Sequence, residues 1–594
     1  MIGGFHSIFG FDSTLDGIKV PSYASHQMIK HFIAVSCYLC LAVFFSAASA
    51  ADRPNIIIMM ADDMGFSDIG CYGGEIHTPN LDQLASDGLR FTQFYNTSRC
   101  CPTRASLLSG LYPHQAGVGH MMDDRGLDGY RGELNRHCVT IAEVLKTAGY
   151  GTYMSGKWHV TKQTKPDGPK DNWPRQRGFD RFFGTIHGAG SYYDPNSLTL
   201  DNTQIPPDKV SDDFYYTEQI ARMTSKFIRE HVAKKTEQPF FIYNAFTSPH
   251  WPMHAREKDI AKYKGRYAKG WDALRRERRR KMVELGIIKE QWPLSPRDKK
   301  AHEWDKLSVQ DQAWFERRME VYAAMVDNMD QGIGKIIQTL KETRQLDNTL
   351  IFFLADNGGC AEEYGNRRDS TATPKQKLEP MKPGELQVNM QPEKTRDGWK
   401  VRTGHGVMPG PADTYIAYGL EWANSSNTPF REYKHWVHEG GISTPLIAHW
   451  PAKISRRGEL ESTPGHLIDL MATCVDVSGA DYPKKFHQNQ SIKPMEGRSL
   501  VPAFVGRGDT IQRKALYWEH EGNRAVRVKN WKLVAKGRQG KWELYDLSKD
   551  RTELEDLADS NPEKVKQMAA LWEAYAIRAN VIPWPEPRKK RKKK

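Results

Sequence analysis

Short, continuous apolar runs that end in polar residues constrain the fold of this chain most strongly. Residues 54–63 read PNIIIMMADD, residues 239–246 read PFFIYNAF, and residues 349–355 read TLIFFLA. Runs of this length without polar alternation are typical of strands that are buried on both faces of a parallel sheet. We therefore expect these three segments to be core strands.

Segments with helical spacing alternate with these strands. They cover residues 139–148, 213–234 and 309–343. The alternation predicts an α/β domain in which a mostly parallel, mixed sheet lies between helices. In such sheets, binding sites form beyond the carboxyl ends of the strands.

The alternation of strands and helices is interrupted in two places and ends near the C-terminus. We expect a surface helical excursion over residues 257–306 and a long functional loop over residues 360–434. Beyond residue 480 the chain breaks into short strand-like segments followed by a helix, at residues 514–521, 524–528, 531–535, 542–546 and 562–579. We predict a catalytic α/β domain over 51–480, a smaller C-terminal α+β subdomain with an antiparallel sheet over 481–587, and a disordered basic tail over 588–594.

The first 50 residues are predicted to be an N-terminal extension and a secretory signal peptide. Lys30 precedes an apolar stretch over residues 32–45, and Ala48-Ser49-Ala50 provides a small-residue cleavage site. A membrane anchor is the alternative, but the stretch is short of the roughly 20 residues that a span needs. We expect an exported protein, periplasmic or extracellular, with no stable membrane span after signal removal. The start codon, Met1 or Met28, is left open.

The net charge does not predict a nucleic-acid-binding protein. The formal charge is +13, and residues 588–594 (RKKRKKK) carry seven of the positive charges. Such a run is typical of a solvated tail, although it also fits contact with a polyanion or an anionic surface. The sequence has no RNP, helix-turn-helix or zinc-finger pattern, so we expect no nucleic-acid partner.

Cysteine is sparse, yet two cysteines are adjacent. After signal removal six of the 8 cysteines would stay, at positions 71, 100, 101, 138, 360 and 474. Six scattered thiols in a chain of this length do not form a disulfide scaffold. The adjacency of Cys100 and Cys101 therefore needs another explanation.

Oxygen ligands follow two of the predicted core strands. Asp62 and Asp63 follow the first strand, and Asp356 and Asn357 follow the third. Taken separately, the first pair could cap a helix and the second could form a turn. Together they form an all-oxygen set that suits Ca²⁺ or Mg²⁺.

Five basic or imidazole side chains also fall at strand ends, where one pocket could gather them. They are Arg104, Lys157, His159, His250 and Lys434. A single such residue is more often structural or solvated. The whole set, with a dication, suits an anionic tetrahedral ester.

Residues 100–110 (CCPTRASLLSG) resemble the sulfatase signature CxPxR with its downstream segment. In that family the first cysteine is converted after translation to formylglycine, an aldehyde. The resemblance implies that Cys100 is the modified nucleophile and that Cys101 fills the variable position, with a vicinal disulfide as the minor alternative. It also implies a formylglycine-generating maturation enzyme as a partner.

The resemblance extends from about Asn55 into the C-terminal region, through GKWH, SPHWP, DNGG and HEGGISTPLIAHWP in the family's usual order. It is similar to the arylsulfatase-type branch of secreted bacterial sulfatases. It implies an alkaline-phosphatase-like core with a smaller C-terminal domain.

The resemblance also implies residue roles. One Ca²⁺ would bind Asp62, Asp63, Asp356, Asn357 and the modified Cys100. Arg104 would hold the formylglycine, Lys157 would bridge it and the sulfate, and His159 would take its remaining hydroxyl proton. His250 and Lys434 would bind the sulfate oxygens and assist departure of the alcohol.

Four positions stay open. A further sulfate contact falls at His187 or Ser191 in TIHGAGSYYD, and the sequence does not choose between them. His405 and His438 are candidates for the substrate approach or for solvated loop histidines.

The predicted function is Ca²⁺-dependent hydrolysis of sulfate monoesters of small aryl alcohols or glycans. One alternative is a phosphoester hydrolase of the alkaline phosphatase superfamily, against which the cysteine in CxPxR argues. Another is a catalytically dead protein that binds sulfated polysaccharide.

Overall fold

The computed structural model describes residues 53–235, 237–365 and 370–585. The predicted signal peptide (residues 1–50) and the basic tail (588–594) lie outside these residues. In the described part of the chain, no helix has both the length and the apolar character needed to cross a bilayer.

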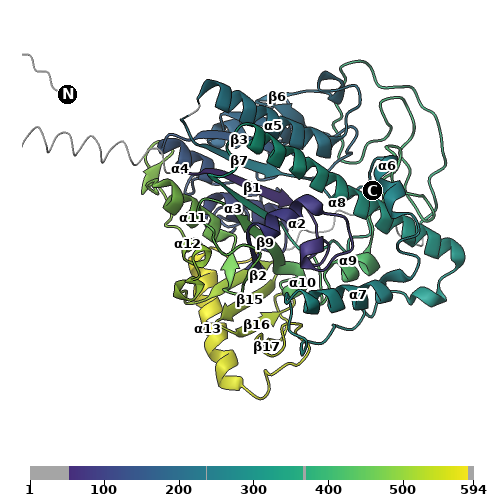
Figure 1. Cartoon of the computed structure of the whole chain (residues 1–594). Coiled ribbons are helices and arrows are strands. Elements are labelled where there is room, and N and C mark those ends of the chain that lie inside the picture. Colours follow the sequence, from purple (N-terminus) through teal and green to yellow (C-terminus); the bar gives the residue numbers. More distant parts are fainter. Residues whose placement is uncertain (1–52, 236, 366–369, 586–594) are drawn as a thin grey trace, which may run out of the picture. The chain divides into compact units, whose positions relative to one another are not determined.

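A mixed sheet forms the centre of the fold (Figure 1). Its parallel core runs in the order β8, β1, β7, β3, β4, while β9, β5 and β6 pair antiparallel to their neighbours. The three apolar runs form β1, β7 and β8, as predicted. In spatial order the strands are β10 (Leu460–Glu461), β2 (Leu89–Tyr95), β9 (Ser443–His449), β8 (Thr349–Ala355), β1 (Asn55–Ala61), β7 (Phe240–Ala245), β3 (Gly151–Lys157), β4 (Arg181–Thr185), β5 (Leu198–Leu200) and β6 (Thr203–Gln204), with β11 (Gly465–His466) beside β2.

Helices cover both faces of the sheet. Strand β1 is apolar throughout because both of its faces are buried under these helices. Ile57 and Met59 pack into one hydrophobic cluster, whereas Ile56 and Ile58 pack into another on the opposite face. The first cluster includes side chains of α2 (Pro79–Ser86), α5 (Tyr216–Lys234) and α8 (Val309–Glu342), and the second those of α3 (Cys100–Ser109), α4 (Ile141–Thr147), α11 (Ile468–Ser478) and α12 (Val501–Phe504). Burial on both faces leaves no polar stripe on a strand, which confirms the expected three-layer arrangement.

The helix boundaries follow local sequence signals. The side chain of Thr140 accepts a hydrogen bond from the Glu143 amide, and the Glu143 carboxylate accepts one from the Thr140 amide, so a capping box starts α4. Ser308 accepts from the Asp311 amide and caps the long helix α8.

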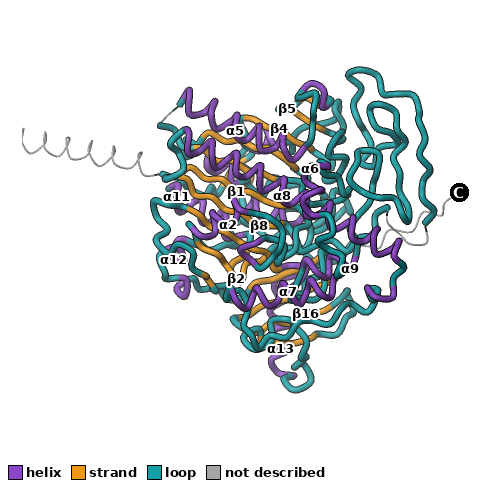
Figure 2. Tube along the Cα trace, turned by 45° about the vertical axis from the view of Figure 1, so that its right-hand side comes forward, coloured by secondary structure: helices purple, strands orange, loops and turns teal. Residues whose placement is uncertain are grey.

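The two interrupting segments differ in structure. The first contains α6 (Glu257–Ile260) and α7 (Gly270–Glu284). The second contains, in its described residues before α9 (Leu420–Ser426), only isolated bridges between loops. In Figure 2 long loops lie beyond α6 and α9.

A second, four-stranded antiparallel sheet follows near the C-terminus, as predicted. It consists of β14 (Leu516–His520), β15 (Asn523–Val528), β16 (Trp531–Ala535) and β17 (Glu543–Asp546), and α13 (Pro562–Arg578) packs against it. A small hairpin, β12 (Lys485–Phe486) with β13 (Gln490–Ser491), precedes it. Tyr95 and Ile442 of the first part of the chain share its hydrophobic cluster, so this sheet is packed onto the larger one. The predicted boundary at residue 480 stays a prediction.

Candidate active site

Parallel strands bring the predicted oxygen ligands to one edge of the sheet. β1 and β8 are adjacent and parallel, with Ala61 paired to Ala355 in register. The residues that follow, Asp62 and Asp63 on one strand and Asp356 on the other, therefore emerge side by side. The Asp63 amide donates to Asp356 Oδ1 at 3.1 Å, and the Asn357 side-chain amide donates to Asp63 Oδ1 at 2.7 Å.

Cys100 is the first residue of α3, and its side chain is almost fully buried at the same edge. Arg104 lies one turn further along the helix, entirely buried. Its guanidinium donates to Asp356 Oδ2 at 2.9 Å and to the Lys157 carbonyl at 2.9 Å, and it lies 3.5 Å from Asp62 Oδ2. Arg104 thereby ties the start of α3 to the ends of three central strands.

Lys157 is the last residue of β3, and its side chain points to the carboxylates. Its Nζ lies 2.5 Å from Asp62 Oδ2, and both side chains are fully buried. The preceding residue, Gly156, has φ +112° and approaches β7 so closely that a Cβ would lie 1.8 Å from the Ala245 carbonyl oxygen. Only glycine fits there, so this position fixes where Lys157 leaves the strand.

His159 and Cys100 face each other across the site. A ring nitrogen of His159 and the Cys100 sulfur lie within 4.8 Å. Burial lowers the pKa of His159 to about 3, so its imidazole is neutral near pH 7. His159 and Asp63 both adopt left-handed backbone conformations, with φ of 57° and 66°. Such conformations cluster at functional sites.

Lys434 connects Asp63 to His250. Its Nζ lies 2.9 Å from Asp63 Oδ2 and 3.3 Å from His250 Nε2, which itself is 3.4 Å from Asp63 Oδ2. His250 Nδ1 lies 2.6 Å from the Trp251 carbonyl, which can only accept, so this nitrogen carries the proton and Nε2 is an acceptor. Burial lowers the pKa of His250 to about 3.

The acidic residues fit a bound dication. Asp62 Oδ1 and Asn357 Oδ1 are buried and have no hydrogen-bond partner among the residues that the structure describes. Burial, together with repulsion from Asp356, raises the pKa of Asp62 well above its ordinary value. A hard cation that prefers oxygen ligands would satisfy these buried acceptors and would neutralise the negative charge of the carboxylates.

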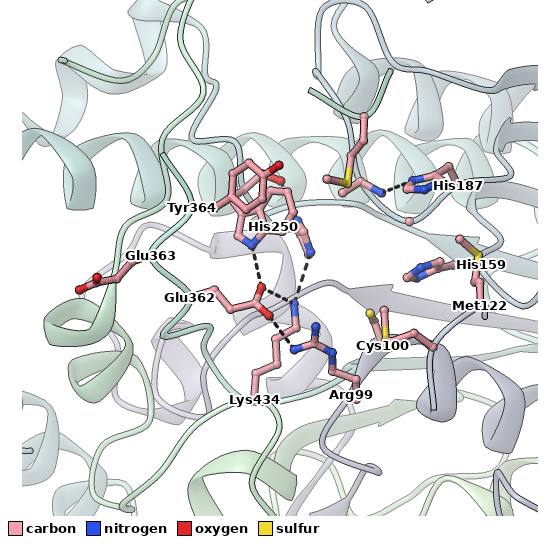
Figure 3. A pocket seen from close by; sticks show the side chains of 15 residues that line it. Arg99, Cys100, Met122, His159, His187, His250, Glu362, Glu363, Tyr364 and Lys434 are labelled. Atoms are coloured by element: carbon pink, nitrogen blue, oxygen red, sulfur yellow. Dashed lines mark hydrogen bonds and ion pairs between the residues drawn. The ribbon is translucent and has the colours of Figure 1, made fainter. Parts of the chain in front are cut away.

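A pocket of about 440 Å³ opens above Cys100 (Figure 3). Its base holds Cys100, His159, His250 and Lys434. Its remaining walls are Arg99, Met121, Met122, His187, Gly188, Ala189, Trp251, Glu362, Glu363, Tyr364 and Met390. Trp251 and Tyr364 stack with ring centroids 4.4 Å apart, which gives the wall a flat apolar face.

Sequence reasoning missed three charged residues of this pocket, Arg99, Glu362 and Glu363. Glu362 lies 2.7 Å from Arg99, 3.6 Å from Lys434 and 3.0 Å from the Trp251 indole nitrogen. Burial alone would raise the pKa of Glu362, but Lys434 and Arg99 lower it well below its ordinary value. Glu362 lies in the long loop, where no periodicity marks it; the only available signal was its position six residues after Asp356.

The structure separates the four positions that the sequence left open. His187 lines the pocket, whereas Ser191 is buried and its hydroxyl accepts from the Tyr193 and Asp194 amides. His405 lies 2.7 Å from Asp311 and packs on Trp314, and His438 is fully buried 3.4 Å from Glu543. Neither lines this pocket of the described residues, and a role for either at the substrate approach stays a prediction.

The adjacent cysteines do not form a disulfide. All six cysteines in the described part of the chain are free, so the vicinal-disulfide alternative is wrong. A hydrogen bond from Cys101 and the charge of Lys157 lower the pKa of Cys100 well below its ordinary value against the effect of burial. Cys101 packs into the apolar cluster beneath α3.

Comparison with known families identifies the chain. The family model "Sulfatase" matches residues 54–480, and the model "N-sulphoglucosamine sulphohydrolase, C-terminal" matches residues 432–576. The chain belongs to the sulfatase family. The predicted membership is thus confirmed, and with it an arylsulfatase-like hydrolase that acts on sulfate esters.

Two relatives align with most of the chain. An uncharacterized sulfatase of Schizosaccharomyces pombe is 32% identical over 91% of this chain and 97% of its own. An arylsulfatase of Klebsiella aerogenes is 35% identical over 76% of this chain and 92% of its own.

Solved structures share the sulfatase fold. Ps i-CgsB in complex with k-i-k-neocarrahexaose superposes with a TM-score of 0.60 at 24% identity, covering 90% of this chain and 98% of its own. A protein bound to its substrate D-glucosamine-2-N,6-O-disulfate superposes with a TM-score of 0.58 at 20% identity, covering 90% and 100%.

Proposed function

We propose that this sulfatase hydrolyses sulfate monoesters with a formylglycine made from Cys100 and one Ca²⁺. The observation that carries the proposal is the placement of Cys100. It lines the pocket with its sulfur within 4.8 Å of a His159 ring nitrogen, at the sheet edge where Lys157 contacts the buried acidic residue Asp62.

Asp62, Asp63, Asp356 and Asn357 would hold the Ca²⁺ together with residue 100. When bound, the cation supplies positive charge against the sulfate oxygens, and formylglycine as its hydrate supplies two hydroxyls on one carbon. The acidic residues supply only oxygen ligands, which favours Ca²⁺ over softer metals.

The chain's own residues position and deprotonate the reacting groups. Arg104 holds the start of α3 against Asp356, which fixes residue 100 over the acidic cluster. Lys157, whose ammonium is held 2.5 Å from Asp62 Oδ2, would bridge residue 100 and the sulfate. His159 is neutral, so it can accept the proton whose loss lets the sulfate depart as residue 100 returns to the aldehyde.

Lys434 is the proton donor that the geometry supports best for the departing alcohol. Asp63 raises its pKa well above the ordinary value in spite of burial, so it is charged. His250 Nε2 faces Lys434 as an acceptor, and it can relay that proton to the ester oxygen. His187 is the further pocket residue that we propose as a sulfate contact.

The substrate class that we propose is a sulfate ester of an aryl alcohol or of a glycan. The stacked pair Trp251 and Tyr364 offers a flat face to an aromatic ring or to the apolar face of a sugar. Relatives named arylsulfatase and N-acetylgalactosamine-6-sulfatase support both kinds of alcohol.

We also propose that the chain is exported to the periplasm or the extracellular space and that a maturation enzyme modifies Cys100. The signal-like segment at residues 32–50 supports export. N-terminal sequencing of the mature protein tests it, with a start just after Ala50 expected.

The test is sulfate release from an aryl sulfate and from a panel of sulfated glycans, by protein from a host that makes formylglycine. Release by the native chain and none by Cys100→Ala is expected. Release of phosphate from phosphomonoesters in place of sulfate would favour the phosphoester hydrolase, and release of neither from a chain with an intact thiol at position 100 would favour the binding protein.

A further inference from the structure

A second group of metal-binding side chains lies outside the candidate active site. His435, His520 and Glu521 each offer one ligand atom, and these atoms lie within 4.8 Å of one another. The group joins distant parts of the chain. His435 directly follows Lys434, whereas His520 ends β14 and Glu521 lies in the turn to β15.

Among the described residues His520 has no partner that explains its position. Its side chain is fully buried, and neither Nδ1 nor Nε2 has a hydrogen-bond partner in that part of the chain. A buried imidazole with both nitrogens unpaired costs free energy, because each nitrogen has lost its hydrogen bond to water without a replacement. A ligand that binds one nitrogen would remove part of that cost.

The surroundings hold the other two side chains toward His520. Glu521 Oε2 lies 3.3 Å from His435 Nδ1, and Glu521 Oε1 lies 2.5 Å from His120 Nε2. The rings of His435 and His520 meet edge to face, with centroids 5.3 Å apart. Burial lowers the pKa of His435 and, more strongly, that of His520, so both imidazoles are neutral and able to bind a metal near pH 7.

We propose that His435, His520 and Glu521 bind a divalent transition metal, with Zn²⁺ as the best fit. Two imidazoles and one carboxylate are ligands of tetrahedral Zn²⁺, with water in the fourth position. The set contrasts with the all-oxygen set around Asp63, so the two sites would take different metals. His120 holds Glu521 in place and is not one of the three ligands, because its Nε2 is engaged by Glu521 Oε1 at 2.5 Å.

The proposed metal would connect the second sheet to the pocket. His435 is adjacent to Lys434 in sequence, and His120 directly precedes Met121 of the pocket wall. A metal between His435 and the β14–β15 turn would therefore fix the loop that carries Lys434. Metal binding at this site does not depend on whether the pocket hydrolyses sulfate esters.

The test measures metal binding without relying on activity. Tag-free full-length protein is stripped with a chelator, supplied with Ca²⁺, and titrated with Zn²⁺ while bound zinc is counted by mass spectrometry. We expect about one Zn²⁺ per chain and a rise in the melting temperature, since a ligand of the folded state stabilises it. With Co²⁺ in place of Zn²⁺ we expect the visible absorption of a tetrahedral site.

Matched variants locate the metal. Glu521→Gln and His435→Gln are partly exposed positions that should tolerate substitution, and His520→Ala removes the buried imidazole. Each should weaken Zn²⁺ binding at least about tenfold. His405→Ala, a histidine outside the group, and Asp63→Asn, in the oxygen site, should leave it unchanged. Absence of bound zinc in the native chain, or its retention in Glu521→Gln and His435→Gln, would overturn the proposal, whether or not sulfate is released.

Discussion

Glu362 Oε2 lies 3.6 Å from Lys434 Nζ, on the side of that ammonium that faces the pocket. Lys434 thus lies between two carboxylates, since Asp63 is 2.9 Å away on the inner side. A carboxylate on the pocket side holds Lys434 and Arg99 in place while the site is free of substrate. The same charge would disfavour a second anionic group on a substrate at this wall.

Replacing Glu362 should therefore change substrate preference. Glu362→Gln keeps the length of the side chain and an acceptor for the Trp251 indole, and removes the charge. We expect kcat/KM to fall about tenfold for a monosulfated aryl ester, because Lys434 loses a charge-assisted contact. For a substrate with a second sulfate the loss should be smaller. Glu363→Gln, the neighbouring wall residue, is the control, and equal losses for both substrates would contradict this role of Glu362.

The adjacent cysteines permit a matched pair of variants. Cys100→Ala should lower kcat by at least about a thousandfold because the nucleophile is lost. Cys101→Ala should keep most of the activity and lose only about 1–2 kcal/mol of stability from the apolar cluster. Cys100→Ser should stall after one event, because a serine ester cannot return to an aldehyde. Steady-state and single-turnover sulfate release distinguish these outcomes, and sustained turnover by verified Cys100→Ser would contradict the mechanism.

Removal of Ca²⁺ should lower both activity and stability. Without the cation, Asp62, Asp63 and Asp356 repel one another in a buried site. We expect a chelator to abolish sulfate release and lower the melting temperature, and Ca²⁺ to restore both. Asp63→Asn should be less active than the native chain even without a chelator, and added Ca²⁺ should raise its activity and melting temperature less. An unchanged melting temperature after verified removal of Ca²⁺ would contradict the proposed ligands.

The pH dependence follows from the buried histidines. Because the pKa of His159 and that of His250 are both lowered to about 3, each imidazole stays neutral well below its ordinary range. A lowered pKa of a base moves the acid limb of kcat/KM to lower pH. We expect kcat/KM for an aryl sulfate to keep more than half of its plateau value at about pH 5. An inflection near the ordinary imidazole pKa would show that one of these histidines is more solvated than the structure indicates.

A buried ion network joins the second sheet to the first. Glu439 contacts Lys532 at 3.0 Å and Arg551 at 2.9 Å, and all three side chains are fully buried. Burial alone would raise the pKa of Glu439, but these cations lower it to about 2. Glu439→Gln should cost about 3–5 kcal/mol of unfolding free energy because it takes one carboxylate away from two buried cations, of which Lys532 keeps only Glu553 at 2.7 Å.

The lowered pKa of Glu439 also sets a pH window. A carboxylate with a depressed folded pKa contributes stability that is complete above its unfolded pKa and is lost as the pH falls through the folded one. The free energy of unfolding, measured from denaturation curves, should therefore fall more for the native chain than for Glu439→Gln between about pH 4.5 and 2. An equal fall of the unfolding free energy in the two proteins over this pH range would contradict the proposed contribution of Glu439.

Local pattern was sufficient for much of the fold and for part of the candidate site. β1, β7 and β8 are apolar on both faces, so the parallel sheet and the meeting of Asp62 with Asp356 at its edge could be predicted. The roles of Glu362 and Arg99 could not be predicted, because their partners are far away in sequence and the loop that carries Glu362 has no periodicity. The choice between His187 and Ser191 likewise depended on which backbone turn faces the pocket.

One measurement tests the formylglycine mechanism most directly. Preparations of the native chain that differ in the fraction modified at position 100, as quantified by peptide mass spectrometry, are assayed for sulfate release with saturating Ca²⁺. We predict that kcat per chain rises in proportion to the formylglycine fraction and extrapolates to zero where only the thiol is present. Undiminished turnover by chains whose Cys100 is wholly unmodified would contradict it.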